Sequence, residues 1–201
     1  FPPFYKGGQP KDAEFMALSL EGGAAGLSFV LLPDAKNDAY TALQAADFIG
    51  RDPREYALEF GTADPIRQMI SMAAINAICQ QVMRATHFEV DSTTDSLGLL
   101  SIEKGDRVGM VGLFHPLMKT IRKSGAQLVV IEKKAQLIEK FPGLPITLDP
   151  AELKTCNKVL CTGTTILNDS LDAILSCCSS DALISVVGPT VGCFPDPLFA
   201  R

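Results

Sequence analysis

Residues 107–116 read Arg107-Val108-Gly109-Met110-Val111-Gly112-Leu113-Phe114-His115-Pro116. The short apolar run before Gly112 is typical of a buried strand, and the glycine provides the turn into a helix predicted over 116–124. The same alternation continues toward the end of the chain. Further strands are predicted at 127–131, 158–161 and 182–187, with helical segments at 133–140 and 168–178. Buried strands separated by helices are typical of a parallel sheet with βαβ crossovers, so we predict the α/β class.

The first half of the chain has a different order of elements. Strands are predicted at 14–20 and 27–32, and the glycine-rich segment 21–26 between them is typical of a hairpin. Predicted helices follow at 39–49, 53–60 and 65–84, the last two each preceded by an aspartate that suits an N-cap. We therefore predict an N-terminal α+β domain over residues 1–95 and an α/β domain over residues 96–201. The polar segment 87–98 supplies the boundary between them.

Composition and charge exclude several classes of protein. The 201 residues are 47% apolar and 20% charged, a globular balance that excludes a disordered chain. The net charge of −5 excludes the basic surface of a nucleic-acid-binding domain, so no nucleic-acid partner is expected. No run of 18 apolar residues occurs, so no membrane span is expected either.

The six cysteines are spaced like packing residues rather than like a metal cage. No CxxC occurs, and no histidine lies within four residues of a cysteine, which excludes zinc-finger and zinc-ribbon sites. Each cysteine lies in an apolar stretch, where a reduced thiol packs as a small hydrophobic group. The start of the chain has neither the basic nor the apolar region of a signal peptide. We therefore expect a reducing, cytoplasmic setting.

Candidate ligand-binding residues follow the predicted strands, because ligands of open parallel sheets bind at the carboxyl ends of the strands. Gly109 and Gly112 allow the backbone to turn and to approach a ligand. Glu132 lies 20 residues after Gly112, at the offset of the acidic residue that meets a ribose in nucleotide-binding folds. The complete GxGxxG motif is absent, however. A strand–helix turn with close packing accounts for the same glycines, so both interpretations stay open.

A denser polar segment follows the strand predicted at 158–161. Thr162, Gly163, Thr164, Thr165 and Asn168 place three hydroxyls, a glycine and an amide between a strand and a helix. Hydroxyls and free backbone N–H groups suit a phosphate, a carboxylate or a polar metal complex. Helix capping explains one polar residue but not four, so we predict a ligand site here.

The last predicted strand ends at the same edge of the sheet. Gly188 and Pro189 follow it directly, and at least one residue of this turn is expected to line the same site. Ligands gather at such an edge because the carboxyl ends of parallel strands all face it.

Three residues are candidate metal ligands: His115, Glu132 and Cys193. His115 lies near a predicted helix N-terminus, whose positive end favours the neutral, metal-binding imidazole; a helix cap or a partly exposed histidine is the alternative. Cys193 follows the turn after the last strand, whereas we interpret the other cysteines as core residues. Oxygen and imidazole ligands of this kind suit a harder ion, or a ligand-borne metal complex, better than a caged heavy metal.

The sequence resembles a family of uncharacterised prokaryotic proteins described as heavy-metal chelation proteins. The resemblance covers nearly the whole chain and is most specific in Thr162-Gly163-Thr164-Thr165-Ile166-Leu167-Asn168, in its place after a strand. Further matching segments are Val108–Gly112, Val130–Glu132, Val187–Thr190, Gly23–Ser28 with Leu32-Pro33, and Ala73–Ala77.

The resemblance implies an N-terminal domain like the enolase N-terminal fold, a Rossmann-like second domain and a homodimer. It also implies a ligand site in the cleft between the domains. Glu132, Thr164, Asn168 and the Gly188-Pro189 turn would face that cleft, and Asn76 would reach it from the first domain. Where the family has a small residue and a hydroxyl, this chain has Asp169-Ser170, so the start of that helix differs.

Three functional hypotheses follow. The first is a binding protein that holds a divalent or heavy metal ion, or a metal-containing small ligand, in the interdomain cleft. The second is an enzyme acting on a nucleotide-like or phosphorylated small molecule at the edge of the sheet, and the third is a scaffold without a small ligand. No standard nucleophile–base motif occurs, so the sequence names no catalytic residue.

Overall fold

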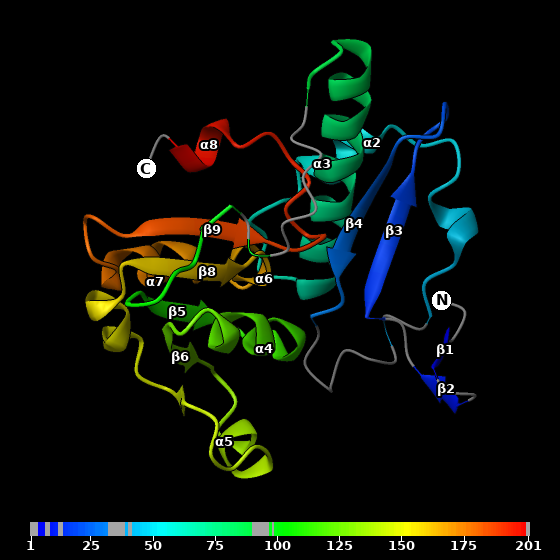
Figure 1. Ribbon diagram of the computed structural model, residues 1–201. Coiled ribbons are helices and arrows are strands. Elements are labelled where there is room, and N and C mark those ends of the chain that lie inside the picture. The colour runs from blue at the N-terminus through cyan, green and yellow to red at the C-terminus, as the bar shows by residue number, and fades with distance from the viewer. Residues whose placement is uncertain are drawn as a thin grey trace. The chain divides into compact units, whose positions relative to one another are not determined.

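The computed structural model describes residues 4–6, 9–11, 14–31, 39, 42–89, 97 and 99–199 of the chain. These fall into two compact units, whose elements are labelled in Figure 1. The first unit comprises Phe1–Asp91 and Pro189–Arg201, and the second comprises Ser92–Gly188. The segment from Pro189 onward thus groups with the first unit, whereas the sequence assigned it to the second domain.

An antiparallel hairpin forms the main sheet of the first unit. β3 (Phe15–Ser19) pairs with β4 (Ala25–Phe29), and the rings of Phe15 and Phe29 meet edge to face with centroids 5.4 Å apart. The connecting turn needs glycine at positions 22 and 23, where φ is 93° and 84°. The predicted hairpin is confirmed, with its second strand beginning two residues earlier than expected. A smaller antiparallel pair, β1 (Phe4–Lys6) and β2 (Gln9–Lys11), precedes it.

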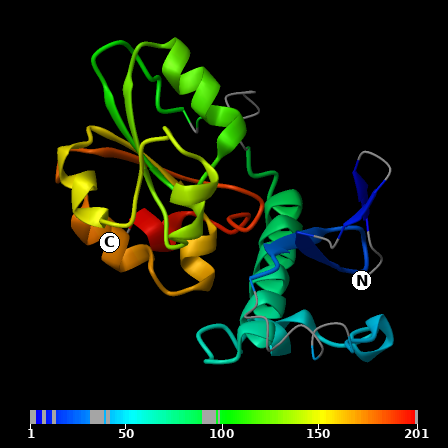
Figure 2. The same ribbon diagram turned by 90° about the horizontal axis from the view of Figure 1, so that it is seen from below.

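The long helix α3 (Pro65–Ala85) packs directly against β4, and Figure 2 shows the helix beside the hairpin. The helix begins where predicted, because the Asp64 side chain accepts the backbone N–H of Ile66 at 3.0 Å. Gly26 permits the close approach: a Cβ there would lie 2.1 Å from the Ala73 carbonyl oxygen and 2.3 Å from the Ala77 nitrogen. The core of this unit comprises Met16, Ile66, Met69, Ile70 and Ala73.

The structure describes two short helical elements between residue 42 and α3. η2 (Ala45–Asp47) is a single 3-10 turn, and α2 (Pro53–Ala57) is capped by Asp52, which accepts the Arg54 N–H at 2.9 Å. The prediction of one helix over 39–49 is wrong for residues 42–44, which are not helical. The turn begins only at Ala45, because the Asp47 carboxylate accepts the Gln44 N–H at 3.4 Å and makes Gln44 its N-cap.

A five-stranded parallel sheet forms the centre of the second unit. The strand order across the sheet is β7-β6-β5-β8-β9. Along the chain, the sheet begins with the central strand β5, adds β6 and β7 on one side and then β8 and β9 on the other, as in the Rossmann fold. The switch point therefore lies between β5 and β8. The predicted α/β class is confirmed. The strands are β5 (Arg107–Val111), β6 (Gln127–Ile131), β7 (Ile146–Thr147), β8 (Lys158–Thr162) and β9 (Leu183–Val187).

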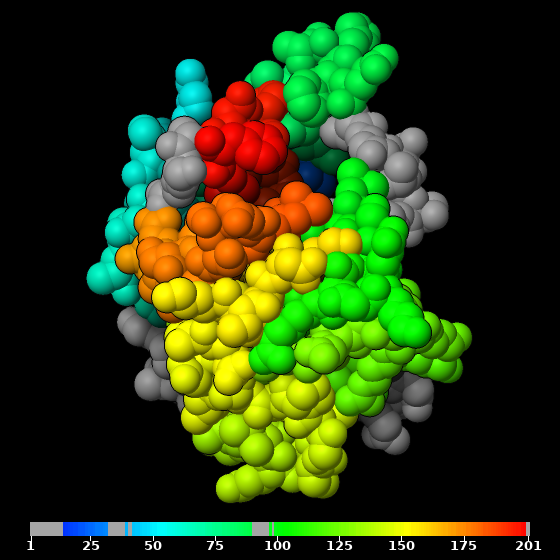
Figure 3. All heavy atoms as spheres, turned by 60° about the vertical axis from the view of Figure 1, so that its left-hand side comes forward, coloured from blue at the N-terminus to red at the C-terminus, as the bar shows by residue number. Residues whose placement is uncertain are grey.

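Helices connect these strands. The predicted helix after β5 is confirmed as α4 (His115–Lys123), whose buried Met118 and Ile121 join the core formed by Val108, Met110, Val130 and Leu160. η3 (Pro150–Thr155), which the sequence did not predict, lies beside α7 (Leu171–Cys177), and their surfaces adjoin in Figure 3. The remaining helical elements are α5 (Gln136–Lys140) and α6 (Thr164–Leu167) in this unit and α8 (Asp196–Phe199) in the first.

The prediction of one helix over 168–178 is wrong at its start. α6 already begins at Thr164 and ends with Asn168 as its C-cap, and α7 begins only after Ser170. Asp169 between them has a φ of 53°, a left-handed conformation that no helix continues through. Across the described part of the chain, every helix is too short or too polar to span a lipid bilayer.

Candidate functional site

The carboxyl edge of the parallel sheet brings together two of the predicted segments. Gly112 follows β5 with a φ of 84°, and a Cβ at this position would lie 3.0 Å from Cγ2 of Thr162 at the end of β8. β5 and β8 are the strands on either side of the switch point. Because loops leave such neighbouring strands in opposite directions, this edge is where open α/β sheets bind ligands.

Glu132 holds the turn after β5. Its Oε1 accepts the backbone N–H of Leu113 at 2.7 Å, and its Oε2 accepts the backbone N–H of the next residue, Lys133, at 3.2 Å. A second hydrogen bond fixes the same turn: the Gly112 N–H donates to the Ile131 carbonyl at 2.9 Å. The carboxylate therefore lies beside the Gly112 turn, and each of its two oxygens accepts a backbone N–H group.

The three threonines of the Thr-Gly-Thr-Thr segment bond to one another. The hydroxyls of Thr162 and Thr164 lie 3.1 Å apart, and the Thr165 hydroxyl donates to the Thr162 carbonyl at 2.7 Å. Thr165 is buried, whereas Thr162 and Thr164 are half-buried at the edge of the sheet. Their hydroxyls are therefore the ones that a ligand would reach.

Asn168 and Gly188 border this segment from two sides. Asn168 is exposed, and its Oδ1 accepts the Ser170 hydroxyl. The Gly163 N–H donates to the Val187 carbonyl at 2.8 Å, which brings the end of β9 and Gly188 next to the threonines. The second unit therefore gathers Gly112, Glu132, Thr162, Gly163, Thr164 and Gly188 at one edge of the sheet.

Two of the predicted ligand-binding residues, Gly109 and Asn76, are engaged elsewhere, and Pro189 groups with the first unit. Gly109 lies within β5, where a Cβ would come 2.4 Å from Cδ2 of Leu153, so close packing against η3 accounts for this glycine. Asn76 is 2% exposed, and its amide is engaged within the first unit by Leu27, Thr190 and Gly192. Pro189, the first residue after the second unit, is exposed.

The candidate metal ligands do not form a cage. No three His, Cys, Asp or Glu side chains come together as a possible metal site anywhere in the described ranges. His115 is exposed at the start of α4, its ring 5.8 Å from that of Phe141. Cys193 belongs to the first unit, and burial raises the pKa of its thiol, which disfavours the thiolate that binds metals.

A cavity in the first unit has no counterpart among the sites predicted from the sequence. It measures about 1070 Å³, lies in the first unit and is lined mainly by apolar side chains, among them Leu18, Phe48, Ile49 and Tyr56. None of the predicted site residues lines it. The scattered apolar residues of η2 and β3 gave no sequence signal, because the same residues also suit a core.

Comparison with known proteins gives a family model, a curated relative and solved structures that resemble this chain. A family model named DUF364 and described as "Putative heavy-metal chelation" matches residues 95–201. An uncharacterized protein of Methanocaldococcus jannaschii is 24% identical over 148 residues; the match covers 74% of this chain and 56% of that protein. The chain thus spans little more than half the length of this curated relative.

Two solved structures share the fold. A protein of unknown function from the DUF364 family of Pyrococcus horikoshii superposes with a TM-score of 0.63 at 20% identity, covering 92% of this chain and 70% of that one. A DUF364 protein of Desulfitobacterium hafniense, also of unknown function, gives a TM-score of 0.67 at 20% identity, covering 93% and 72%.

Proposed function

This chain belongs to the DUF364 family, described as "Putative heavy-metal chelation", and we propose that its second unit binds a small ligand that carries its own metal ion. The ligand would lie at the carboxyl edge of the parallel sheet. The observation that carries the proposal is the close approach of Gly112 to Thr162 at the switch point, with Glu132 holding the Gly112 turn. Such an edge offers hydroxyls and backbone groups to a polar ligand.

The side chains at this edge do not fit a bare metal ion. Both Glu132 oxygens accept backbone N–H groups, and the described residues contain no group of three metal-ligating side chains. A metal held by an organic chelator brings most of its ligands with it, so the protein has to recognise only the outer polar atoms of the complex. The half-buried hydroxyls of Thr162 and Thr164 suit that task.

Native mass spectrometry tests this proposal on protein purified without a metal-affinity tag. We expect the parent chain to carry a bound species heavier than any single metal ion. This species should be absent from Thr164→Val and present in Thr155→Val. Thr155 is the matched control because it precedes β8 and so lies at the opposite, amino end of the same strand. A bound ion without an organic component would overturn the proposal.

A thermal-shift panel covers the case in which the ligand is lost during purification. The probes are ferric citrate, nickel-histidine and iron protoporphyrin, each beside the same metal as its chloride. Stabilisation by a chelate but not by its chloride, weakened in Thr164→Val, supports the proposal, because a ligand stabilises only the state that binds it. A flat response to the whole panel, with no co-purified mass, counts against it.

A nucleotide-like ligand at the same edge is the second candidate. The observation that favours it is the Rossmann strand order with a glycine turn after the first strand and an acidic residue, Glu132, after the second. The same thermal-shift assay with NAD, S-adenosylmethionine and ATP distinguishes it. Stabilisation by one of these, lost in Gly112→Val, would favour the nucleotide over the metal complex.

A further inference from the structure

A cavity of about 370 Å³ lies along α4 in the second unit, away from the threonine segment. Its lining consists of His115, Met118, Lys119, Arg122 and Lys123 of α4, together with Leu144 from the segment before β7. We call this cavity the basic groove. Four of its six lining residues carry nitrogen groups that are or can become cationic, and none carries a carboxylate.

The cations of the basic groove have no anionic partner among the described residues. Lys119, Arg122 and Lys123 are exposed, and none of them belongs to an ion pair among the described residues. Several other cations of the chain behave differently. Arg107 pairs with Glu152 at 2.6 Å, Lys158 with Asp106 at 2.7 Å, and Arg67 with Glu59 at 3.1 Å. No ion pair among the described residues therefore neutralises the three cations that line this cavity.

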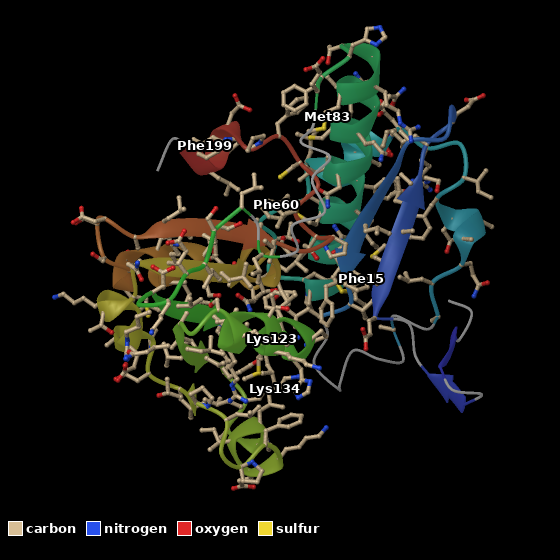
Figure 4. All side chains as sticks on the ribbon, in the orientation of Figure 1. Phe15, Phe60, Met83, Lys123, Lys134 and Phe199 are labelled. Atoms are coloured by element: carbon tan, nitrogen blue, oxygen red, sulfur yellow. The ribbon has the colours of Figure 1, made fainter. Side chains whose placement is uncertain are left out.

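Charge is concentrated in this part of an otherwise acidic chain. Residues 115–140 contain six lysines and arginines against two glutamates, whereas the whole chain has a net charge of −5. Lys123 of α4 and Lys134, which precedes α5, are labelled in Figure 4. A local excess of one charge attracts ligands of the other and raises their association rate.

The walls of the groove are apolar. Of the lining residues, Met118 is buried and Leu144 is half-buried; Phe141 lies outside the lining, with its ring 5.8 Å from that of His115. Lys140 adds a further cation over the Phe141 ring, 5.6 Å from its centroid. Charged groups above apolar walls hold an anion more strongly than the same charges on a flat wet surface, because the local dielectric is lower.

We propose that the basic groove binds a small molecule that carries more than one phosphate group. The planar fork of Arg122 suits two phosphate oxygens at once, and Lys119 and Lys123 supply point charges within one helical turn of it. A volume of about 370 Å³ is at the lower end of small-molecule sites, so the groove suits a compact polyanion. His115, a candidate metal ligand by sequence, lies instead among cations that repel a metal ion.

Isothermal titration calorimetry tests this with tripolyphosphate and with ATP as probes, at low and at high salt. We expect binding of at least one probe at low salt, at least tenfold weaker in Lys119→Gln/Arg122→Gln, and weaker again at high salt. Lys154→Gln is the matched control, because Lys154 is an exposed lysine of the same unit outside the groove and should leave the affinity unchanged. Equal affinities of tripolyphosphate and ATP identify the phosphates as the recognised group, whereas tighter ATP binding adds the nucleoside.

Three outcomes would overturn the proposal. The first is that neither probe binds at low salt. The second is that Lys154→Gln loses as much affinity as Lys119→Gln/Arg122→Gln. The third is that a single-stranded oligonucleotide or polyglutamate binds more tightly than both probes. Thermal unfolding of each variant separates lost binding from lost folding. The variant Thr164→Val should bind tripolyphosphate normally, so this proposal and the proposed function at the sheet edge fail or succeed separately.

Discussion

The side-chain amide of Asn76 donates to the backbone carbonyl of Thr190 across 2.8 Å, joining residues 114 positions apart. The same amide nitrogen donates to the Leu27 carbonyl at 2.7 Å, and its oxygen accepts the Gly192 N–H at 3.1 Å. The Thr190 hydroxyl accepts the Phe29 N–H at 3.1 Å. One buried side chain of α3 thus ties the returning C-terminal segment to β4.

Replacing Asn76 with alanine should destabilise the first unit. The change leaves two carbonyls and one N–H without their partner in a buried site, so we expect the free energy of unfolding to fall by about 3 kcal/mol. Urea denaturation measures the loss, and faster hydrogen exchange at the Gly192 amide would locate it. Asn168→Ala, at an exposed asparagine, should change the free energy of unfolding by less than about 0.5 kcal/mol. An equal effect of the two substitutions would contradict this account.

The sequence predicted the elements that have strong local signals. Asp52 and Asp64 cap helices as expected, and the apolar run 127–131 forms a strand with the predicted ends, because capping and burial are properties of short segments. The break at Asp169 was missed because a left-handed aspartate has no reliable local signature. The return of Thr190 to the first unit depends on a hydrogen bond over 114 residues, which no local pattern encodes.

The candidate site could be predicted in part for the same reason. The rule that loops at the carboxyl ends of parallel strands meet at one edge correctly placed Gly112, Glu132 and Thr162 near one another. It could not show that each oxygen of the Glu132 carboxylate accepts a backbone N–H group. Nor could it show that the Leu153 side chain fills the space beside Gly109. Both facts depend on packing between elements.

The contact between Gly112 and Thr162 makes a double-mutant cycle informative. Gly112→Ala should cost about 1–2 kcal/mol in the free energy of unfolding, because alanine is strained at a φ of 84° and its Cβ would press on the Thr162 methyl group. Thr162→Ser removes that methyl group and should relieve part of the cost. We expect a coupling energy of about 0.5–1 kcal/mol from urea denaturation of the four proteins. Strict additivity would show that the two residues do not meet.

Asp106 should make the second unit sensitive to acid. Its pKa is lowered to about 2 by the Lys158 ammonium at 2.7 Å, then by the Glu103 N–H and the Asn157 amide. Because the pKa is lower in the folded state, the stabilisation is complete above the ordinary value of 3.8 and is lost as the pH falls toward about 2.

Urea denaturation at pH 6 and at pH 2.5 checks the effect of Asp106. In Asp106→Asn we expect a lower free energy of unfolding at pH 6, by about 1 kcal/mol, and a smaller decrease on acidification than in the parent chain. Asp181→Asn, at an exposed aspartate of the same unit, should leave the decrease unchanged. A parent-like pH dependence in Asp106→Asn would rule out the ion pair as its source.

Four thiols of the folded chain, those of Cys156, Cys161, Cys178 and Cys193, should be poor ligands for soft heavy metals at neutral pH. Burial raises the pKa of Cys156, Cys161 and Cys193, and raises that of Cys178 to about 11, so these four groups stay protonated. We expect N-ethylmaleimide to label Cys156 and Cys161 on the order of a hundredfold more slowly in the folded chain than in urea, as mass spectrometry of peptides would show. Cadmium should give its thiolate charge-transfer absorbance only after unfolding. Rapid labelling of Cys161 would contradict its burial, and that absorbance in the folded chain at neutral pH would show that the folded chain binds heavy metal through sulfur.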